Sequence, residues 1–187
     1  MNIKFLSPKI LLKLFDSMIS PILLYGCELW EPYLNQDIDK WDANPIEKVH
    51  TQFIKRILGV NRSTTNILVR GDLGRHSLQS KCIIKNIRYI KYIKQKEQRY
   101  TVKQAYDYEM SQSEKRININ SSGKKFNENL NNLLEREINI YTIPENKLRS
   151  YIDTVFHNNW NEKINNSTKA DTYKQFKTKP KFEGYLD

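Results

Sequence analysis

Residues 46–60 read IEKVHTQFIKRILGV, and this stretch decides the fold class. Its apolar side chains recur every three or four residues, which is the period of a helix with one apolar face. Asn44 and Pro45 form a typical helix start, since proline suits the first helical position, and Gly59 suits the C-terminal cap. The stretch therefore predicts an amphipathic helix.

Helical patterns continue on both sides of this stretch. Ser7 and Pro8 begin one helix, and Ser63 or Thr64 can cap a short one. Ser77 can cap a long helix that runs to about residue 102, and Pro144 precedes another. Little of the chain alternates between apolar and polar residues as a strand does. We predict an all-α fold, a bundle of about five to seven helices with an N-terminal helix-turn-helix-like part and a looser C-terminal helical part.

Composition divides the sequence into three predicted regions. Residues 1–103 are predicted to form one helical domain. Residues 111–127 are rich in Ser, Asn, Lys and Gly, and we predict a polar linker over residues 104–127. Residues 128–187 are predicted to form a small helical C-terminal region with a basic tail.

Apolar positions on the predicted helices supply an expected N-terminal core. His50 lies on the apolar side of its helix and is expected to be a hydrogen-bonded core residue. Tryptophans 30, 41 and 160 are expected to pack, although Trp41 lies in a polar loop and could be exposed. The expected core residues are Leu14, Leu24, Phe53, Ile57 and Leu58.

Positive charge is concentrated in residues 81–103. The chain carries a net charge of +10, and this segment alone has eight basic residues and one acidic residue, a net charge of +7. Lysine-rich codon bias would spread such an excess over the whole chain. The concentration therefore points to a polyanionic partner.

Drawn as one helix at about 100° per residue, residues 81–103 separate into two faces. Cys82 and the isoleucines 83, 87, 90 and 93 form the apolar face. The other face can follow nucleic-acid phosphates and stack a base on its tyrosine; the alternative is an ordinary solvated lysine face. The candidate nucleic-acid-binding residues on it are Lys81, Lys85, Arg88, Tyr92, Lys96, Arg99 and Lys103.

Two further arginines flank the sequence Gly-Asp-Leu-Gly at residues 71–74. This is not a phosphate-binding loop, because it lacks the lysine and the glycine spacing of one. Arg70 and Arg75 could nevertheless clamp a phosphate bidentately; equally, one of them could pair with Asp72. Gly74 is expected to permit a tight turn.

No catalytic, metal or cofactor site is predicted. His50, His76 and His157 are isolated, and Cys27 and Cys82 lack metal-ligand spacing. The cysteines are expected to be reduced thiols, and with no signal peptide we expect an intracellular protein, in nucleus or cytoplasm. The apolar run at 18–24 is too short to cross a membrane, so no membrane partner is expected.

Three stretches carry a family resemblance. They are SPILLYGCELW at 20–30, IEKVHTQFIKRILGV at 46–60 and STTNILVRGDLGRHSL at 63–78. Their order and spacing resemble those of the segment that follows the reverse transcriptase domain in LINE-type non-LTR retrotransposons. The tail TYKQFKTKPKFEGYLD also resembles that family. Two residues differ from the family pattern. The family more often has Glu at the position of Asp72, and it often has a bulkier residue at the position of Gly184.

The resemblance implies a helical thumb or post-thumb segment that grips template and primer. The expected partners are then RNA or DNA, contacted mainly through the nucleic-acid backbone, and the rest of the reverse transcriptase polypeptide. The paired aspartates that hold the metal ions of such a polymerase are not found as a motif here, so we expect a non-catalytic fragment and not an enzyme. The alternative is a remnant all-helical protein-interaction module with no nucleic-acid role.

Overall fold

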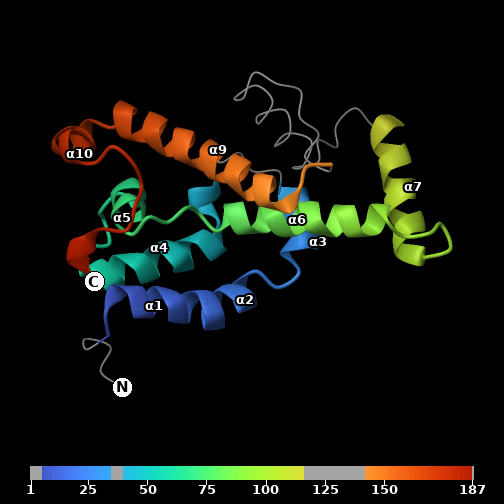
Figure 1. Ribbon diagram of the computed structural model, residues 1–187, viewed down its shortest axis with the longest axis horizontal. Coiled ribbons are helices and arrows are strands. Elements are labelled where there is room, and N and C mark those ends of the chain that lie inside the picture. Colours follow the sequence, from blue (N-terminus) through green and yellow to red (C-terminus); the bar gives the residue numbers. More distant parts are fainter. Residues whose placement is uncertain (1–5, 35–39, 116–141, 187) are drawn as a thin grey trace. The chain divides into compact units, whose positions relative to one another are not determined.

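The computed structural model describes residues 6–34, 40–115 and 142–186, and it confirms the predicted all-α class (Figure 1). Within those ranges, the β-structure amounts to one isolated bridge between Leu73 and Phe182. The α-helices are α1 (Pro8–Leu14), α2 (Ser20–Leu23), α3 (Cys27–Leu34), α4 (Pro45–Leu58), α5 (Asn66–Asp72), α6 (Gln79–Lys94), α7 (Thr101–Lys115), α9 (Glu145–Asn166) and α10 (Asp171–Phe176). Shorter elements are a π-helical turn (Phe15–Ile19) and 3-10 turns at Trp41–Ala43, Thr168–Ala170 and Gly184–Leu186.

The chain divides into two compact units. The first comprises Met1–Tyr25, Asp37–Ser80 and Asp153–Asp187, and the second comprises Gly26–Gln36 and Lys81–Ile152. The boundaries thus fall inside α6 and α9 rather than near residues 103 and 128. Each unit is assembled from segments that are distant in sequence, which local composition does not reveal.

Helix α7 corrects the prediction of a polar linker that starts at residue 104. Residues 101–115 are helical although most are polar. The segment contains neither glycine nor proline, and its Gln, Ala, Glu and Lys residues have high helix propensity. The remaining residues of the predicted linker, 116–127, and the start of the predicted C-terminal region, 128–141, lie outside the described part of the chain.

Helix α4 in the first unit forms as its sequence predicts. The Asn44 side chain accepts a hydrogen bond from the Ile46 backbone N–H at 2.9 Å, Pro45 occupies the first turn, and Gly59 ends the helix with φ of 65°. The buried side chains, however, are Glu47, His50, Thr51 and Ile54. The helix therefore buries a largely polar face.

The core of the first unit lies where α1 and the π-helical turn pack against α4. Phe15 is fully buried, and its ring centroid lies 4.7 Å from that of Phe53 and 5.2 Å from that of His50. Leu24 is buried as expected, but Leu14 is exposed, so its place in the predicted core is wrong. One cluster is formed by Leu12, Ile54, Val69 and Leu73, against which the half-buried Phe53, Ile57 and Leu58 pack.

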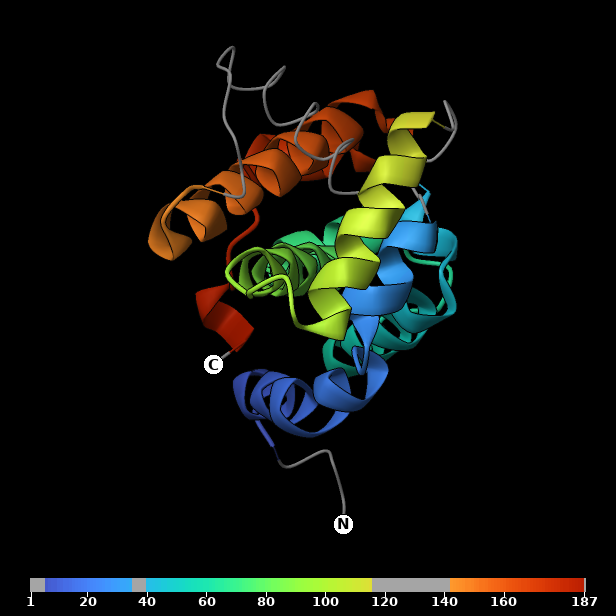
Figure 2. The ribbon, with the colours of Figure 1, turned by 90° about the vertical axis from the view of Figure 1, so that its right-hand side faces the viewer.

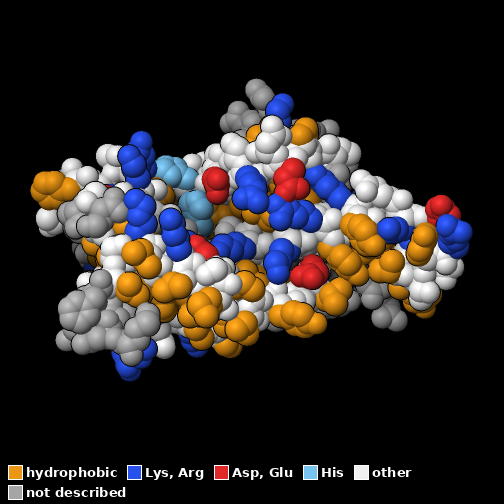
Figure 3. All heavy atoms as spheres, turned by 60° about the horizontal axis from the view of Figure 1, so that its bottom comes forward, with side chains coloured by type: hydrophobic (Ala, Val, Ile, Leu, Met, Phe, Trp, Pro, Cys, Tyr) orange, Lys and Arg blue, Asp and Glu red, His pale blue; other side chains and the backbone are white. Residues whose placement is uncertain are grey.

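Leu14 belongs instead to an exposed apolar row. Its members, four residues apart, are Ile10, Leu14, Met18 and Ile22. Such positions drift by about 40° per step around an α-helix, but the π-helical turn at Phe15–Ile19 has more residues per turn and reduces that drift. Figure 3 shows hydrophobic side chains gathered over α1 and α2 in the first unit.

The C-terminal segment packs on α5 in the first unit. Lys181 and Glu183 donate backbone hydrogen bonds to the carbonyls of Gly71 and Asp72 at 3.1 and 3.0 Å. Gly74 has φ of 58°, and a Cβ there would lie 2.6 Å from the Phe182 nitrogen. The turn expected at Gly74 is thus confirmed, and glycine is needed there for both its conformation and this close approach.

Candidate nucleic-acid interface

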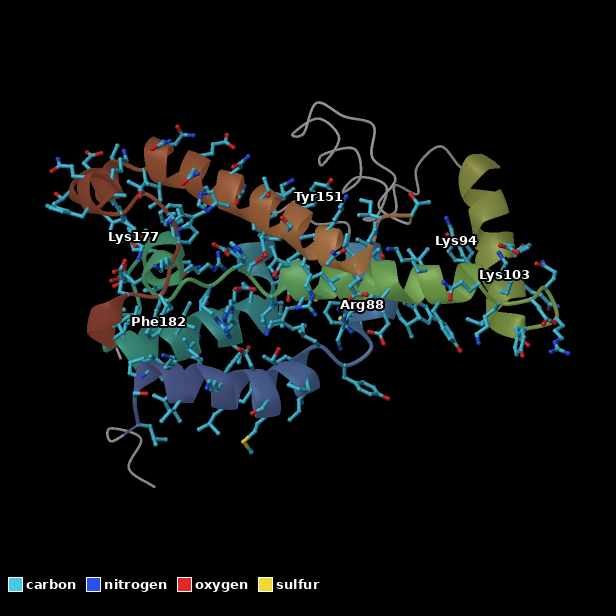
Figure 4. All side chains as sticks on the ribbon, in the orientation of Figure 1. Arg88, Lys94, Lys103, Tyr151, Lys177 and Phe182 are labelled. Carbon is cyan, nitrogen blue, oxygen red and sulfur yellow. The ribbon has the colours of Figure 1, made fainter. Side chains whose placement is uncertain are left out.

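The predicted basic face spans two helices of the second unit rather than one. Helix α6 ends at Lys94, and α7 begins at Thr101 and crosses the end of α6 (Figures 1 and 2). The side chain of Gln104 donates a hydrogen bond to the carbonyl of Gln98 at 3.0 Å in the turn between them. The single helix over 81–103 is therefore wrong, and Lys103 lies on α7 (Figure 4).

The apolar face of α6 agrees with the prediction. Cys82, Ile83, Ile87 and Ile93 are buried and Ile90 is half-buried. Asn86 on the same helix donates to the carbonyl of Glu28 in α3 at 3.0 Å. These contacts bury one side of α6. Lys81, Lys85, Arg88 and Tyr92 share the other side of the helix, as predicted from the helical period.

Four residues at the α6–α7 turn, Tyr92, Lys96, Arg99 and Tyr100, form what we call the corner cluster. The Lys96 Nζ lies 4.3 Å from the ring centroid of Tyr92 and 5.5 Å from that of Tyr100. The Arg99 Cζ lies 5.4 Å from the Tyr100 centroid. The Tyr92 and Tyr100 side chains are 53% and 43% exposed. Cations and accessible rings thus alternate, an arrangement suited to phosphate contact and base stacking.

Tyr100 was not among the predicted residues. It follows Tyr92 and Lys96 at a spacing of four, a signal that the sequence does contain. Within a continuous helix, however, it would have looked like one more aromatic residue beside the stripe. The turn after Lys94 brings it to Lys96 and Arg99.

Several predicted cations already have acidic partners. Arg88 forms an ion pair with Glu145, and the Lys103 Nζ lies 2.8 Å from Asp107 Oδ1. In the corner cluster, the Arg99 Nε lies 2.9 Å from Glu97 Oε2. The hydrogen bond from Lys103 lowers the pKa of the Asp107 carboxyl. Surface pairs of this kind contribute little to stability, because water screens both charges. A phosphate can therefore replace these carboxylates at small cost. Lys81, Lys85, Arg88 and Lys103 are all half-buried.

Arg70 and Arg75 do not form the expected phosphate clamp. The Arg75 guanidinium holds both oxygens of Asp16 at 2.7 Å, and Arg70 Nη2 contacts Asp42 at 2.5 Å and Glu47 at 2.8 Å. Neither pairs with Asp72, which accepts a hydrogen bond from Tyr173. Both arginines lie in the first unit, and these carboxylates neutralise the charges that would attract a phosphate.

Glu47 is the centre of a buried hydrogen-bond network in the first unit. Its carboxylate accepts from Trp41 Nε1 at 3.1 Å, from Arg70 Nη2 at 2.8 Å and from the Leu78 backbone N–H at 2.7 Å. His50 Nδ1 lies 2.8 Å from Glu47 Oε1, the oxygen that also accepts from Arg70. This confirms His50 as a hydrogen-bonded core residue. Trp41, which could have been exposed, is completely buried.

The network makes the stability of the first unit sensitive to acid. Burial by itself raises the pKa of Glu47, but the hydrogen bond from His50 and the charge of Arg70 outweigh it and lower the pKa from 4.5 to about 2. Because the folded pKa lies below the unfolded one, this stabilisation, about 3 kcal/mol, is present above about pH 5 and is lost as the pH falls towards 2. Burial also lowers the pKa of His50, so His50 protonation adds to the loss below about pH 6.5.

We therefore expect the free energy of unfolding, measured with urea at pH 7, 5 and 3, to fall mainly between the last two values. Glu47→Gln should make the fall in the free energy of unfolding between pH 5 and pH 3 smaller. A parent chain equally stable at pH 7 and pH 3 would contradict the assignment of the carboxylate as ionised and buried.

The two cysteines, isolated in sequence, come together in the second unit. Cys27 and Cys82 are buried free thiols, and a hydrogen bond between them lowers the pKa of Cys27. Over the described ranges, no group of His, Cys, Asp and Glu side chains is placed to hold a metal ion, and no helix has the length and apolar character needed to cross a membrane. No protein-family model, curated protein or solved structure matches this chain.

Proposed function

We propose that this chain binds RNA or DNA, mainly through backbone phosphates, with the surface formed by α6, the corner cluster and the start of α7. The observation that carries the proposal is the corner cluster, in which two cations lie against two exposed tyrosine rings. It lies within a segment of net charge +7. Phosphate contacts supply affinity that depends on salt, and the rings supply stacking that does not depend on base identity.

In this proposal the chain is a non-catalytic part of a reverse transcriptase polypeptide of the LINE-type non-LTR class. The support is the three ordered stretches at 20–30, 46–60 and 63–78. The template or primer strand, and the rest of that polypeptide, are the proposed partners. A surface that follows the phosphate backbone without reading base edges suits such a role, because a polymerase must hold every sequence equally.

The second candidate function is a helical protein-interaction module. The exposed row of Ile10, Leu14, Met18 and Ile22 favours it, since contiguous apolar surface on a folded chain often marks a contact site. This row and the corner cluster belong to different units. Variants in one therefore test one function without altering the surface of the other.

The test compares charge-matched variants of the full chain in binding to single-stranded RNA. Lys96→Met with Arg99→Met removes two phosphate contacts and should make the log–log salt slope shallower by about 1.4, at about 0.7 per contact. Tyr92→Ala should weaken binding by about 1–3 kcal/mol with an unchanged slope, because stacking releases no counterions. Fluorescence anisotropy at several salt concentrations measures both quantities.

The control is Lys147→Met with Arg149→Met, which removes the same two charges from exposed positions on α9 in the second unit. We expect it to change the slope by much less than the corner-cluster variant. If both double variants lower affinity equally, binding follows net charge alone and the corner cluster has no special role. If neither does, the interaction module becomes the better account.

A further inference from the structure

The packing of α3 against α6 in the second unit brings the two cysteines of the chain together. Cys27 is the first residue of α3, and Cys82 lies in the first turn of α6. Both are free thiols without exposed surface, and a hydrogen bond joins them. Two thiols in contact can do what neither can do alone, which is to form a disulfide.

A second contact, one turn further along α6, holds the two cysteines in this arrangement. Asn86 follows Cys82 by four residues and therefore lies on the same face of α6. Its side chain donates a hydrogen bond at 3.0 Å to the carbonyl of Glu28, the neighbour of Cys27. Asn86 is only 3% exposed, so little water competes for this bond. The start of α3 is thus fixed against the face of α6 that carries Cys82.

Cys27 is the thiol of the pair that should react first. The hydrogen bond with Cys82 lowers the pKa of Cys27, and the charge of Lys85 adds to this, although burial opposes both. The thiolate is the nucleophilic form of cysteine. A side chain without exposed surface is closed to a bulky oxidant such as oxidised glutathione. Leu29, two residues further along α3, is 55% exposed, so a brief local opening can admit an oxidant as small as hydrogen peroxide.

We propose that Cys27 and Cys82 are a peroxide-sensitive thiol pair, which hydrogen peroxide oxidises to a disulfide between α3 and α6. The Cys27 thiolate attacks one peroxide oxygen, so that an S–O bond forms, the O–O bond breaks, and the departing hydroxide takes up a proton to become water. The Cys82 sulfur then attacks the Cys27 sulfenic acid. The S–S bond forms, the S–O bond breaks, and a second water leaves with the Cys82 proton. The two thiols supply the two electrons that reduce the peroxide, and the proposal does not rest on the nucleic-acid function.

The experiment treats the folded full chain with hydrogen peroxide, unfolds it in urea with an alkylating reagent, and counts the alkylated cysteines by intact mass. Peroxide also oxidises exposed methionines such as Met18, so the alkylation count and not the total mass reports the thiols. We expect both cysteines to escape alkylation, a linked peptide with Cys27 and Cys82 after proteolysis, and recovery of both thiols with dithiothreitol.

The disulfide should also stabilise the second unit, because it closes a long loop of the unfolded chain. We expect the oxidised chain to melt about 5–10 °C above the same sample after dithiothreitol. Methionine oxidation is present in both samples and cancels in this comparison. Circular dichroism measures both melting temperatures.

Cys82→Ala is the control, because it keeps Cys27 and removes the thiol that completes the disulfide. Peroxide should then leave Cys27 as a sulfenic acid that dimedone traps, and dithiothreitol should not change the melting temperature. If this variant does not fold, the comparison in the parent chain still decides. The proposal is overturned if both cysteines of the folded parent remain open to alkylation after peroxide, or if the disulfide formed links two chains. It is also overturned if the internally linked chain melts below the reduced chain, because the disulfide would then not fit the folded second unit.

Discussion

Glu47→Ala is expected to lower the free energy of unfolding of the first unit by about 3–5 kcal/mol, the usual cost of breaking a buried ion pair by removing one partner. The variant leaves Trp41 Nε1, the Leu78 N–H and one edge of Arg70 without their acceptor in a buried setting. Such a loss is a large share of the 5–15 kcal/mol that stabilises a typical domain. Urea denaturation followed by tryptophan fluorescence measures it.

Glu162→Ala is the matched control for this variant, because Glu162 is an exposed glutamate on α9 in the same unit. We expect it to change the free energy of unfolding by less than about 0.5 kcal/mol. If Glu47→Ala does not fold at all, Glu47→Gln keeps the shape of the side chain and one acceptor oxygen, and should give an intermediate loss. Equal stability of Glu47→Ala and Glu162→Ala would contradict the network.

Phe15→Ala is expected to destabilise the first unit by about 3–5 kcal/mol, the range for removing a fully buried aromatic ring. Phe15 has no exposed surface and lies against Phe53 and His50. The ring fills the space between the π-helical turn and α4, so its loss leaves a cavity there. The midpoint of urea unfolding should move strongly towards lower denaturant.

Met18→Ala in the same π-helical turn is the control, since Met18 is 63% exposed. We expect a change of less than about 0.5 kcal/mol. Similar losses for Phe15→Ala and Met18→Ala would mean that the turn is rotated and that the row from Ile10 to Ile22 is buried instead.

The ends of the helices could be predicted from the sequence. The face that a helix buries could not always be predicted. Asn44, Pro45 and Gly59 mark the ends of α4 correctly because capping depends on neighbouring residues alone. Glu47 is buried because its hydrogen-bond donors come from residues 41, 70 and 78, which are brought together only by the fold. A glutamate beside an apolar face gives no local sign of such partners.

The sequence predicted which residues contribute to the candidate nucleic-acid interface, but not that they lie on two helices joined by a turn. Residues 81–103 contain the cations of the proposed interface, and Tyr92 is exposed at its centre. No glycine or proline marks the end of α6, so periodicity extends one helix through the turn. The ion pairs of Arg70 and Arg75 could not be predicted, because their partners Asp16, Asp42 and Glu47 are 23 to 59 residues away in sequence.

The central claim is that this surface binds the backbone of a nucleic acid through about four phosphate contacts, made by Arg88, Lys96, Arg99 and Lys103. The direct test is the dissociation constant of the full chain for single-stranded RNA between about 50 and 200 mM salt. At roughly 0.7 per contact, the log–log slope should be about −3, which weakens binding about 60-fold over that range. A slope near zero, or a slope of −3 that survives replacement of all four residues by methionine, would contradict the account.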